Sequence, residues 1–163
     1  MTDDKSGCAM WGWRNPVANK ITNYYNVYIM AVYERFEDLP VWQEAALLYN
    51  LALDLLQAQN VRLGPGWRLQ FERAALSVSS NVAEGFERLT SNELRSFLVI
   101  ARGSAGEIRS MVSIVIRRPE VRPHVAQLKE IRTVAESCTR QLGAWLQTIK
   151  RRPKQTRRSQ TQR

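Results

Sequence analysis

Apolar residues recur at helical spacing in four segments of the chain, which predicts four amphipathic helices. The clearest pattern lies in the segment that ends at residue 116, where the apolar positions alternate at intervals of three and four residues. A stripe of this kind is typical of a helix that buries one face in a core. Its predicted buried positions are Leu94, Phe97, Leu98, Ala101, Ser104, Ala105, Ile108, Met111, Val112 and Val115.

The other three helices follow from the same spacing and from the residues that interrupt it. The first is predicted to begin near Asp38 or Leu39, with Asp38 able to cap it and Pro40 in its first turn, and to end before the breaker Leu-Gly-Pro-Gly at residues 63–66. The second runs from about Trp67 to Arg88, and the fourth ends at Ile149. Predicted buried positions are Trp42, Ala45, Ala46, Tyr49, Ala52, Leu53 and Leu56 in the first helix, Phe71, Ala75, Val78, Val82 and Phe86 in the second, and Leu128, Ile131, Ala135, Cys138, Leu142, Trp145 and Ile149 in the fourth.

Four helices joined by short turns predict an all-α fold, an up-and-down antiparallel four-helix bundle over residues 36–150. The third helix begins at a polar turn, where Thr90 as the cap would complete a capping box with Glu93; Ser91 is the alternative cap. Within that helix, residues 103–106 read Gly-Ser-Ala-Gly, which lowers helix propensity. We therefore expect a second helix or another subunit to approach closely there.

The segments that flank the predicted bundle have different compositions. Residues 1–35 are rich in Trp and Tyr and show no helical period, and three interpretations stay open. The segment is a disordered leader, an aromatic arm that stacks on bases, or untranslated sequence upstream of a start at Met30. Residues 151–163, with Lys150, form a basic tail that is predicted to be disordered, because seven of the last fourteen residues are Lys or Arg and none is acidic.

The positive charge is concentrated in the last third of the chain. The net charge of the whole chain is +9. Residues 36–116 hold 7 basic and 9 acidic residues, a net of −2, whereas residues 117–163 hold 13 basic and 3 acidic residues, a net of +10. This distribution indicates a polyanionic partner for the C-terminal region, with nucleic acid as the leading class.

A basic ridge is predicted beside the apolar stripe of the third helix. Arg88, Arg95, Arg102 and Arg109 stand seven residues apart, so each lies two turns beyond the last with about 20° of drift. The predicted nucleic-acid-binding residues are these four together with Lys150, Arg151, Arg152, Lys154, Arg157 and Arg158 of the tail. Two other interpretations of the ridge remain, a plain solvated face and intersubunit salt bridges to Glu93 or Glu107.

A second polar file lies on the second helix, at Arg73, Ser77, Asn81 and Glu84. One interpretation is a binding or catalytic groove around Asn81 and Glu84. The favoured one is a structural network in which Glu84 pairs with Arg88 and Asn81 bonds to a neighbouring helix or subunit. No His, Cys or second acid is placed to form an acid/base pair with Glu84.

Candidate chemistry is otherwise sparse. Cys8 and Cys138 form no metal or redox spacing, and a buried free thiol is expected at Cys138, in keeping with a reducing cytoplasm. No stretch has the length of a membrane span or the layout of a signal peptide. We expect a cytoplasmic protein that is not an enzyme, with no cofactor and no metal site.

The central runs AALSVSSNVAEGFER and NELRSFLVIARGSAGE resemble the bacterial four-helix bundle protein family that is often encoded in intervening sequences of 23S ribosomal RNA genes. The run from Phe36 to Leu56 is similar to the first helix of that family, and the resemblance covers roughly residues 36–150. It implies an up-and-down bundle, a homopentamer and no known catalysis. Ser79 stands where the family usually has Pro, which implies a weaker kink in the second helix.

The family is distantly similar to the accessory protein of diversity-generating retroelements, which implies an alternative function. On that interpretation the main partner is a reverse transcriptase and nucleic acid is secondary. The leading hypothesis is a non-enzymatic oligomeric bundle that binds RNA or DNA through its basic residues, because a symmetric ring would repeat every arginine ridge and every tail.

Overall fold

The computed structural model of the protein describes residues 33–58 and 61–149, and within these residues it contains four long helices and no β-strand. The helices are α2 (Pro40–Gln57), α3 (Pro65–Phe86), α4 (Ser91–Val115) and α5 (Val125–Thr148), with short 3₁₀ turns η1 (Phe36–Asp38) and η2 (Pro119–His124). The all-α prediction is confirmed for this part of the chain. The predicted leader up to residue 32 and the predicted tail from residue 150 lie outside the described residues.

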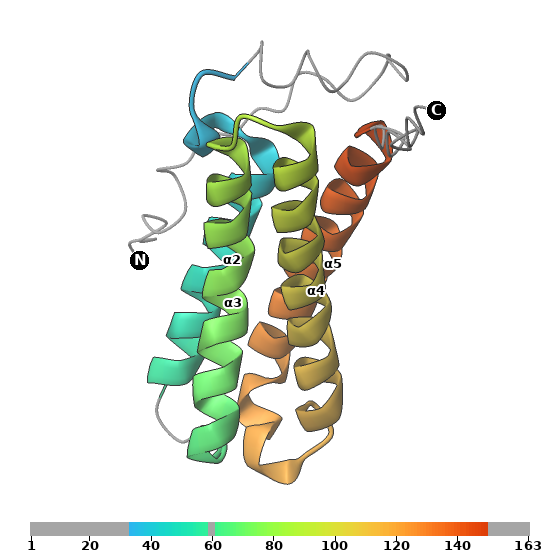
Figure 1. Ribbon diagram of the computed structural model, residues 1–163. Helices are drawn as coiled ribbons and strands as arrows, with labels where there is room; N and C mark the ends of the chain where they lie inside the picture. The colour runs from blue at the N-terminus through green and yellow to red at the C-terminus, as the bar shows by residue number, and fades with distance from the viewer. Residues whose placement is uncertain (1–32, 59–60, 150–163) are drawn as a thin grey trace, which may run out of the picture.

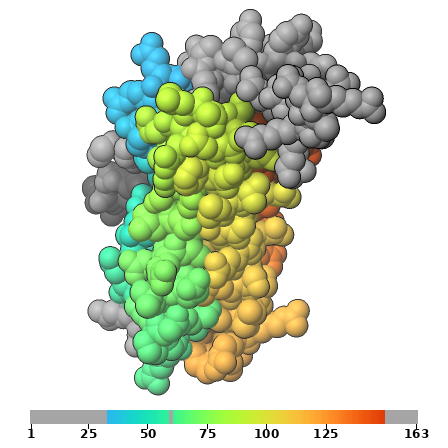
Figure 2. Space-filling model, viewed as in Figure 1, coloured from blue at the N-terminus to red at the C-terminus, as the bar shows by residue number. Residues whose placement is uncertain are grey.

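The four helices form an up-and-down bundle in which each packs against its neighbours in the chain and α5 returns to α2 (Figure 1). Hydrogen bonds join adjacent helices in antiparallel register: Ser77 Oγ lies 2.8 Å from Ser104 Oγ between α3 and α4. Between α5 and α2, Gln141 Nε2 donates to Glu44 Oε2 at 2.5 Å. Figure 2 shows that α3 and α4 together form one broad face of the molecule.

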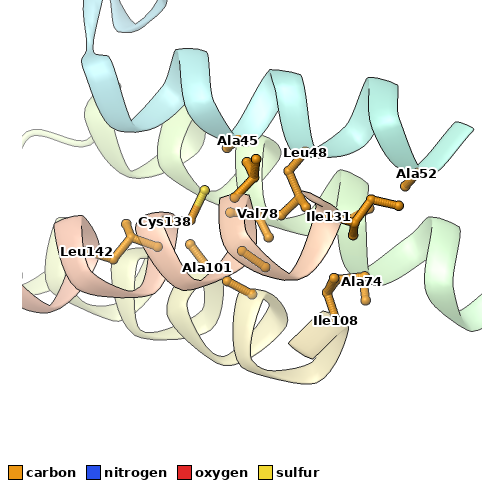
Figure 3. Packing of buried hydrophobic residues seen from close by; sticks show 14 of the residues in the cluster. Ala45, Leu48, Ala52, Ala74, Val78, Ala101, Ile108, Ile131, Cys138 and Leu142 are labelled. Atoms are coloured by element: carbon orange, nitrogen blue, oxygen red, sulfur yellow. The ribbon is translucent and has the colours of Figure 1, made fainter. Parts of the chain in front are cut away.

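The core contains the apolar stripes of all four helices (Figure 3). Every predicted buried position of α3 and of α5 is buried, and in α4 the exceptions are Phe97 and Ser104, which are half-buried toward α3. α3 continues without interruption past Ser79, whose buried hydroxyl donates to the carbonyl of Leu76 at 3.1 Å. The heptad pattern therefore identified the inner face of three helices correctly.

The inner face of α2 differs from the prediction. Val41, Leu48 and Leu55 lie on its buried side, whereas Trp42 and Tyr49 are half-buried beside it. Trp42 packs edge-on against the ring of Phe36 in η1, with the ring centroids 5.2 Å apart, and both rings border the core. The prediction of Trp42 and Tyr49 as buried positions is wrong in degree, because both files share Ala45 and Ala52 and the larger aromatic side chains dominated the pattern.

Of the two predicted helix caps, the one at α2 is wrong and the one at α4 is confirmed. Asp38 does not cap α2: the N-cap is Leu39, which makes no side-chain cap, and Pro40 takes the first helical position, where it lacks an amide to satisfy. At α4 the prediction of Thr90 is confirmed, since Thr90 Oγ1 accepts from the Glu93 amide at 3.3 Å. The Glu93 carboxylate accepts from the Thr90 hydroxyl at 2.5 Å, which stabilises the same turn.

α3 and α4 approach each other closely at Gly85, which is buried. A β-carbon on Gly85 would lie 3.0 Å from Phe97 Cβ and 3.3 Å from Leu94 Cδ1. A β-carbon moves only with its backbone, so Phe97 cannot yield by a rotamer change. Gly85 therefore sets the spacing of the two helices beside the turn that joins them.

We expect Gly85→Ala to destabilise the fold by about 1 kcal/mol, because overpacking costs about 1–3 kcal/mol and exceeds the roughly 1 kcal/mol of helix propensity gained. Gly143→Ala is the matched control: it lies inside α5, and its β-carbon would meet Arg102 at an ordinary 3.7 Å. That variant should be slightly more stable than the parent. Urea unfolding followed by circular dichroism measures both, and equal stability of the two variants would contradict the close contact.

Candidate functional site

Two of the predicted ridge residues project from α4 across its seam with α5. Arg95 Nη1 donates to the backbone carbonyl of Leu146 at 3.1 Å, in the last turn of α5. Arg102 is exposed and lies over Gly143, whose missing side chain leaves room for the guanidinium: a β-carbon there would lie 3.7 Å from Arg102 Nε. The ridge is therefore one wall of a groove between two helices, which α5 completes.

Arg109 contacts α5 one step further along the same groove. Its Nε lies 3.7 Å from Glu136 Oε1, and the Nε of Arg132 lies 3.6 Å from the same oxygen atom. These two contacts are ion pairs without hydrogen bonds, because both distances exceed hydrogen-bonding range. Sequence reasoning missed Arg132 and Glu136. Their i, i+4 spacing is a visible signal, but the side of α5 that meets α4 is known only from the packing.

The groove contains two open clefts. The larger, of about 500 Å³, is lined by Gly106, Arg109, Ser110, Ser113, Arg132 and Glu136. The smaller, of about 300 Å³, is lined by Val99, Arg102, Gly103, Thr139 and Leu146. Each cleft thus combines at least one arginine of the predicted ridge with small residues of α4 and with side chains of α5. Guanidinium groups in an open polar groove suit an anionic ligand.

Arg88 does not share the helix of the other three ridge residues. α3 ends at Phe86, so Arg88 lies in the turn before α4. Its guanidinium pairs with Glu84 and lies over the ring of Phe97, 4.8 Å from the centroid. The prediction of one continuous four-residue ridge on one helix is wrong at this position, because the seven-residue spacing crosses a turn. The alternative partners of the ridge are also bonded elsewhere, since Glu107 accepts from Gln70 at 2.7 Å.

The polar file of α3 is divided among separate contacts. Asn81 Nδ2 donates to the Ser77 carbonyl at 2.7 Å and to its hydroxyl at 3.0 Å, and Ser77 in turn bonds to Ser104 of α4. Glu84 pairs with Arg88, whereas Arg73 is exposed. Asn81 therefore bonds within its own helix and not directly to a neighbour, and Ser77 provides the link between the helices. Asn81 and Glu84 are not joined by a hydrogen bond in the described structure.

The small residues of α4 point in two directions. Ser104 and Ala105 contact the interior of the bundle, but no atom of another described helix lies within 4 Å of a β-carbon placed on Gly103 or Gly106. The prediction of a close helix–helix contact is wrong for these two glycines, and its alternative, a contact with another subunit, stays a prediction. They lie on the open side of α4, beside the half-exposed Val99.

α5 ends beside the groove. Its last residue is Thr148, and Arg95 bonds to Leu146 within its last turn. The predicted tail residues, from Lys150 to Arg158, come next in the sequence and lie outside the described residues.

Two further properties concern the described residues as a whole. Within residues 33–58 and 61–149, no three His, Cys, Asp or Glu side chains are grouped so as to bind a metal ion. None of the helices that the structure describes combines the length and apolar character that a membrane span requires.

Comparison with known proteins gives one finding. The family model described as 23S rRNA-intervening sequence protein matches residues 37–144, which extend from η1 through most of α5. The match therefore includes Arg95, Arg102 and Arg109 together with Arg132 and Glu136 of α5, and it ends before Leu146. Comparison with curated proteins and with solved structures gave no match.

Proposed function

The chain belongs to the 23S rRNA-intervening sequence protein family, and we propose that it is a non-enzymatic, oligomeric bundle that binds nucleic acid through basic residues. The observation that carries the proposal is the groove between α4 and α5. Arg102, Arg109 and Arg132 line it, and it leads to the end of α5 from which the basic tail continues. A groove and a tail of the same charge suit one extended polyanion.

Phosphate contacts, and not base reading, supply the affinity in this proposal. Arginine and lysine side chains bind phosphate oxygens by charge and by hydrogen bonds, which fixes the position of a strand without selecting its sequence. The larger cleft has two arginines with flanking serines, glycine and Glu136, whereas the smaller cleft combines Arg102 with Gly103, Thr139 and the apolar Val99 and Leu146. RNA is the first probe because the family is described through 23S rRNA, and duplex DNA is the comparison.

We expect Arg102→Ala to weaken RNA binding about three- to ten-fold and to reduce the salt slope by about one, because Arg102 has no ion pair to release among the described residues. Arg73→Ala is the control, since Arg73 is equally exposed but lies on α3, away from the groove. Fluorescence anisotropy with a labelled structured RNA, repeated from 50 to 300 mM salt, measures both quantities.

Two results of that series would count against the proposal. If Arg102→Ala and Arg73→Ala have the same effect, the groove is not the binding surface. If the whole chain binds neither RNA nor DNA at physiological salt, nucleic-acid binding is wrong as a function. A protein partner such as a reverse transcriptase would then be the better hypothesis.

The oligomeric part of the proposal depends on the outward face of α4. Ile100 and Ile114 line neither cleft and are 50% and 70% exposed there. Exposed aliphatic side chains on one side of a helix suit burial against another subunit, which would leave the groove open. A ring, with five copies implied by the family resemblance, would repeat the groove and multiply weak phosphate contacts.

A further inference from the structure

Two guanidinium groups from different helices converge in the larger cleft. Arg109 of α4 and Arg132 of α5 approach the same carboxylate oxygen of Glu136, at 3.7 and 3.6 Å. The Nε of Arg109 is buried and has no hydrogen-bond partner within the described residues. The cleft therefore holds two positive charges and one negative charge, and the Nε–H of Arg109 remains available as a hydrogen-bond donor.

Arg109 differs from the other ridge residues because a second arginine, Arg132, lies close to its guanidinium group. Arginines seven residues apart on α4 are separated by about 10 Å along the helix axis, and in the structure they meet different partners: Arg95 bonds to the Leu146 carbonyl, and Arg109 pairs with Glu136. Arg109 and Arg132 face each other across the groove, and both already contact a single oxygen atom. Two guanidinium forks at one point match the oxygen atoms of a phosphate group, which they bind in bidentate fashion.

The neighbouring serines differ in what they offer. Ser113 donates its hydroxyl to the Arg109 carbonyl at 2.7 Å, so its proton is already used. Ser110 lines the same cleft, and its hydroxyl makes no hydrogen bond within the part of the chain that the structure describes. Gly106 contributes no side chain and leaves the opening of the cleft clear.

We infer that this cleft is a binding site for one phosphate group, which Arg109, Arg132 and Ser110 bind after displacing the Glu136 carboxylate. Glu136 keeps the two arginines in place in the empty site and competes with the ligand. The inference rests on the proposed function where the phosphate belongs to a nucleic-acid strand. A free phosphate or a small phosphorylated molecule presents the same chemistry, and the experiment separates these sources.

A plain interhelical ion pair is the competing explanation, and it predicts the opposite result at Glu136. If Glu136 only stabilises the fold, Glu136→Gln lowers stability slightly and leaves binding unchanged, because half-exposed ion pairs contribute little. If Glu136 competes with phosphate, Glu136→Gln tightens binding. Glu130→Gln is the matched control: it makes the same change in net charge on α5, at an exposed position outside the cleft.

The experiment uses the full chain and two probes. Inorganic phosphate is titrated at constant ionic strength while the Nε–H signals of Arg109 and Arg132 are followed by NMR. A single-stranded RNA oligomer is titrated into the same variants by anisotropy. We expect Glu136→Gln to tighten phosphate binding about three-fold or more over Glu130→Gln, and Arg132→Ala to weaken it about ten-fold relative to Arg140→Ala, as the loss of one charge-assisted contact predicts.

The outcomes distinguish the site from the proposed function. If phosphate shifts both signals and RNA binding changes in parallel, the ligand is the strand backbone. If phosphate shifts both signals but these variants do not change RNA binding, the site binds a small phosphorylated ligand and RNA binds through other residues. If phosphate shifts both signals and the chain does not bind RNA, the site is retained and the proposed function is wrong. If phosphate shifts neither signal, or Glu136→Gln behaves as Glu130→Gln does, the inference is overturned.

Discussion

Removing residues 150–163 is expected to lower the affinity for RNA about 100-fold at 0.1 M salt, the largest loss of any change considered for binding. Seven of these fourteen residues are Lys or Arg, and none is acidic. Each neutralised phosphate contributes roughly 0.7 to 0.9 to the slope of log affinity against log salt, so the slope should fall by up to about six if all seven residues contact phosphates. The residual slope measures what the groove contributes.

A variant of full length provides the control for that truncation. Replacing the seven basic residues of the tail by Gln keeps the chain length and removes only the charge, and it should lose as much affinity as the truncation. Ile149 is buried and must remain in both variants, because it belongs to the apolar stripe of the last helix. Full affinity of the truncated chain would show that the bundle alone binds the strand, and Arg102→Ala would then have a larger effect than proposed.

Arg95 joins α4 to the last turn of α5. The last carbonyl groups of a helix lack partners within it, and Arg95 donates to one of them, that of Leu146. This contact joins the first two turns of α4 to the last turn of α5, from which the tail continues. Arg95 therefore acts in the structure as a cap of α5, and its guanidinium is less free to bind a phosphate than that of Arg102.

The sequence predicted the bundle well because periodicity determines which side of a helix is buried. Every position that was predicted to be buried in α3 and α5 is buried, since their apolar residues are regularly spaced. The prediction missed Ala74, Val134 and Leu146, which are buried as well. In α2 nearly every position is apolar, so the pattern admits two adjacent files. In the structure the file that contains Leu48 is buried and Tyr49 is half-buried. Which of the two files faces the core depends on packing against the neighbouring helices, and the local sequence does not determine it.

The site was predicted less completely for a related reason. A seven-residue spacing places arginines along a line on a helix, and Arg95, Arg102 and Arg109 do form such a line. It does not specify what the line faces. The groove arises because α5 returns beside α4, and the contacts of Arg132 and Glu136 depend on the register of that return. Gly85 illustrates the same limit, because a close helix approach leaves no periodic signal.

We expect the thiol of Cys138 to react at least about 1,000-fold more slowly in the folded protein than in the unfolded chain. Cys138 is fully buried, and burial, together with the nearby Glu44 carboxylate, raises the pKa of its thiol from 9.0 to about 12. Since the thiolate is the reactive species, three pKa units alone reduce its population about 1,000-fold below pH 9. A Cys8→Ser chain, labelled with a thiol reagent in buffer and in urea, isolates Cys138.

The same pKa determines how stability changes with pH. The unfolded chain releases the Cys138 proton near pH 9, whereas the folded chain retains it to about pH 12. The stabilisation is therefore complete below pH 9 and is lost as the pH rises from 9 to 12, by on the order of 1 kcal/mol per pH unit. Subtracting the pH profile of Cys138→Ala removes the titration of Lys and Tyr. A flat difference, or rapid labelling of the folded chain, would mean that the interface of α5 with α2 is open to water at Cys138 and that the bundle is looser than the structure.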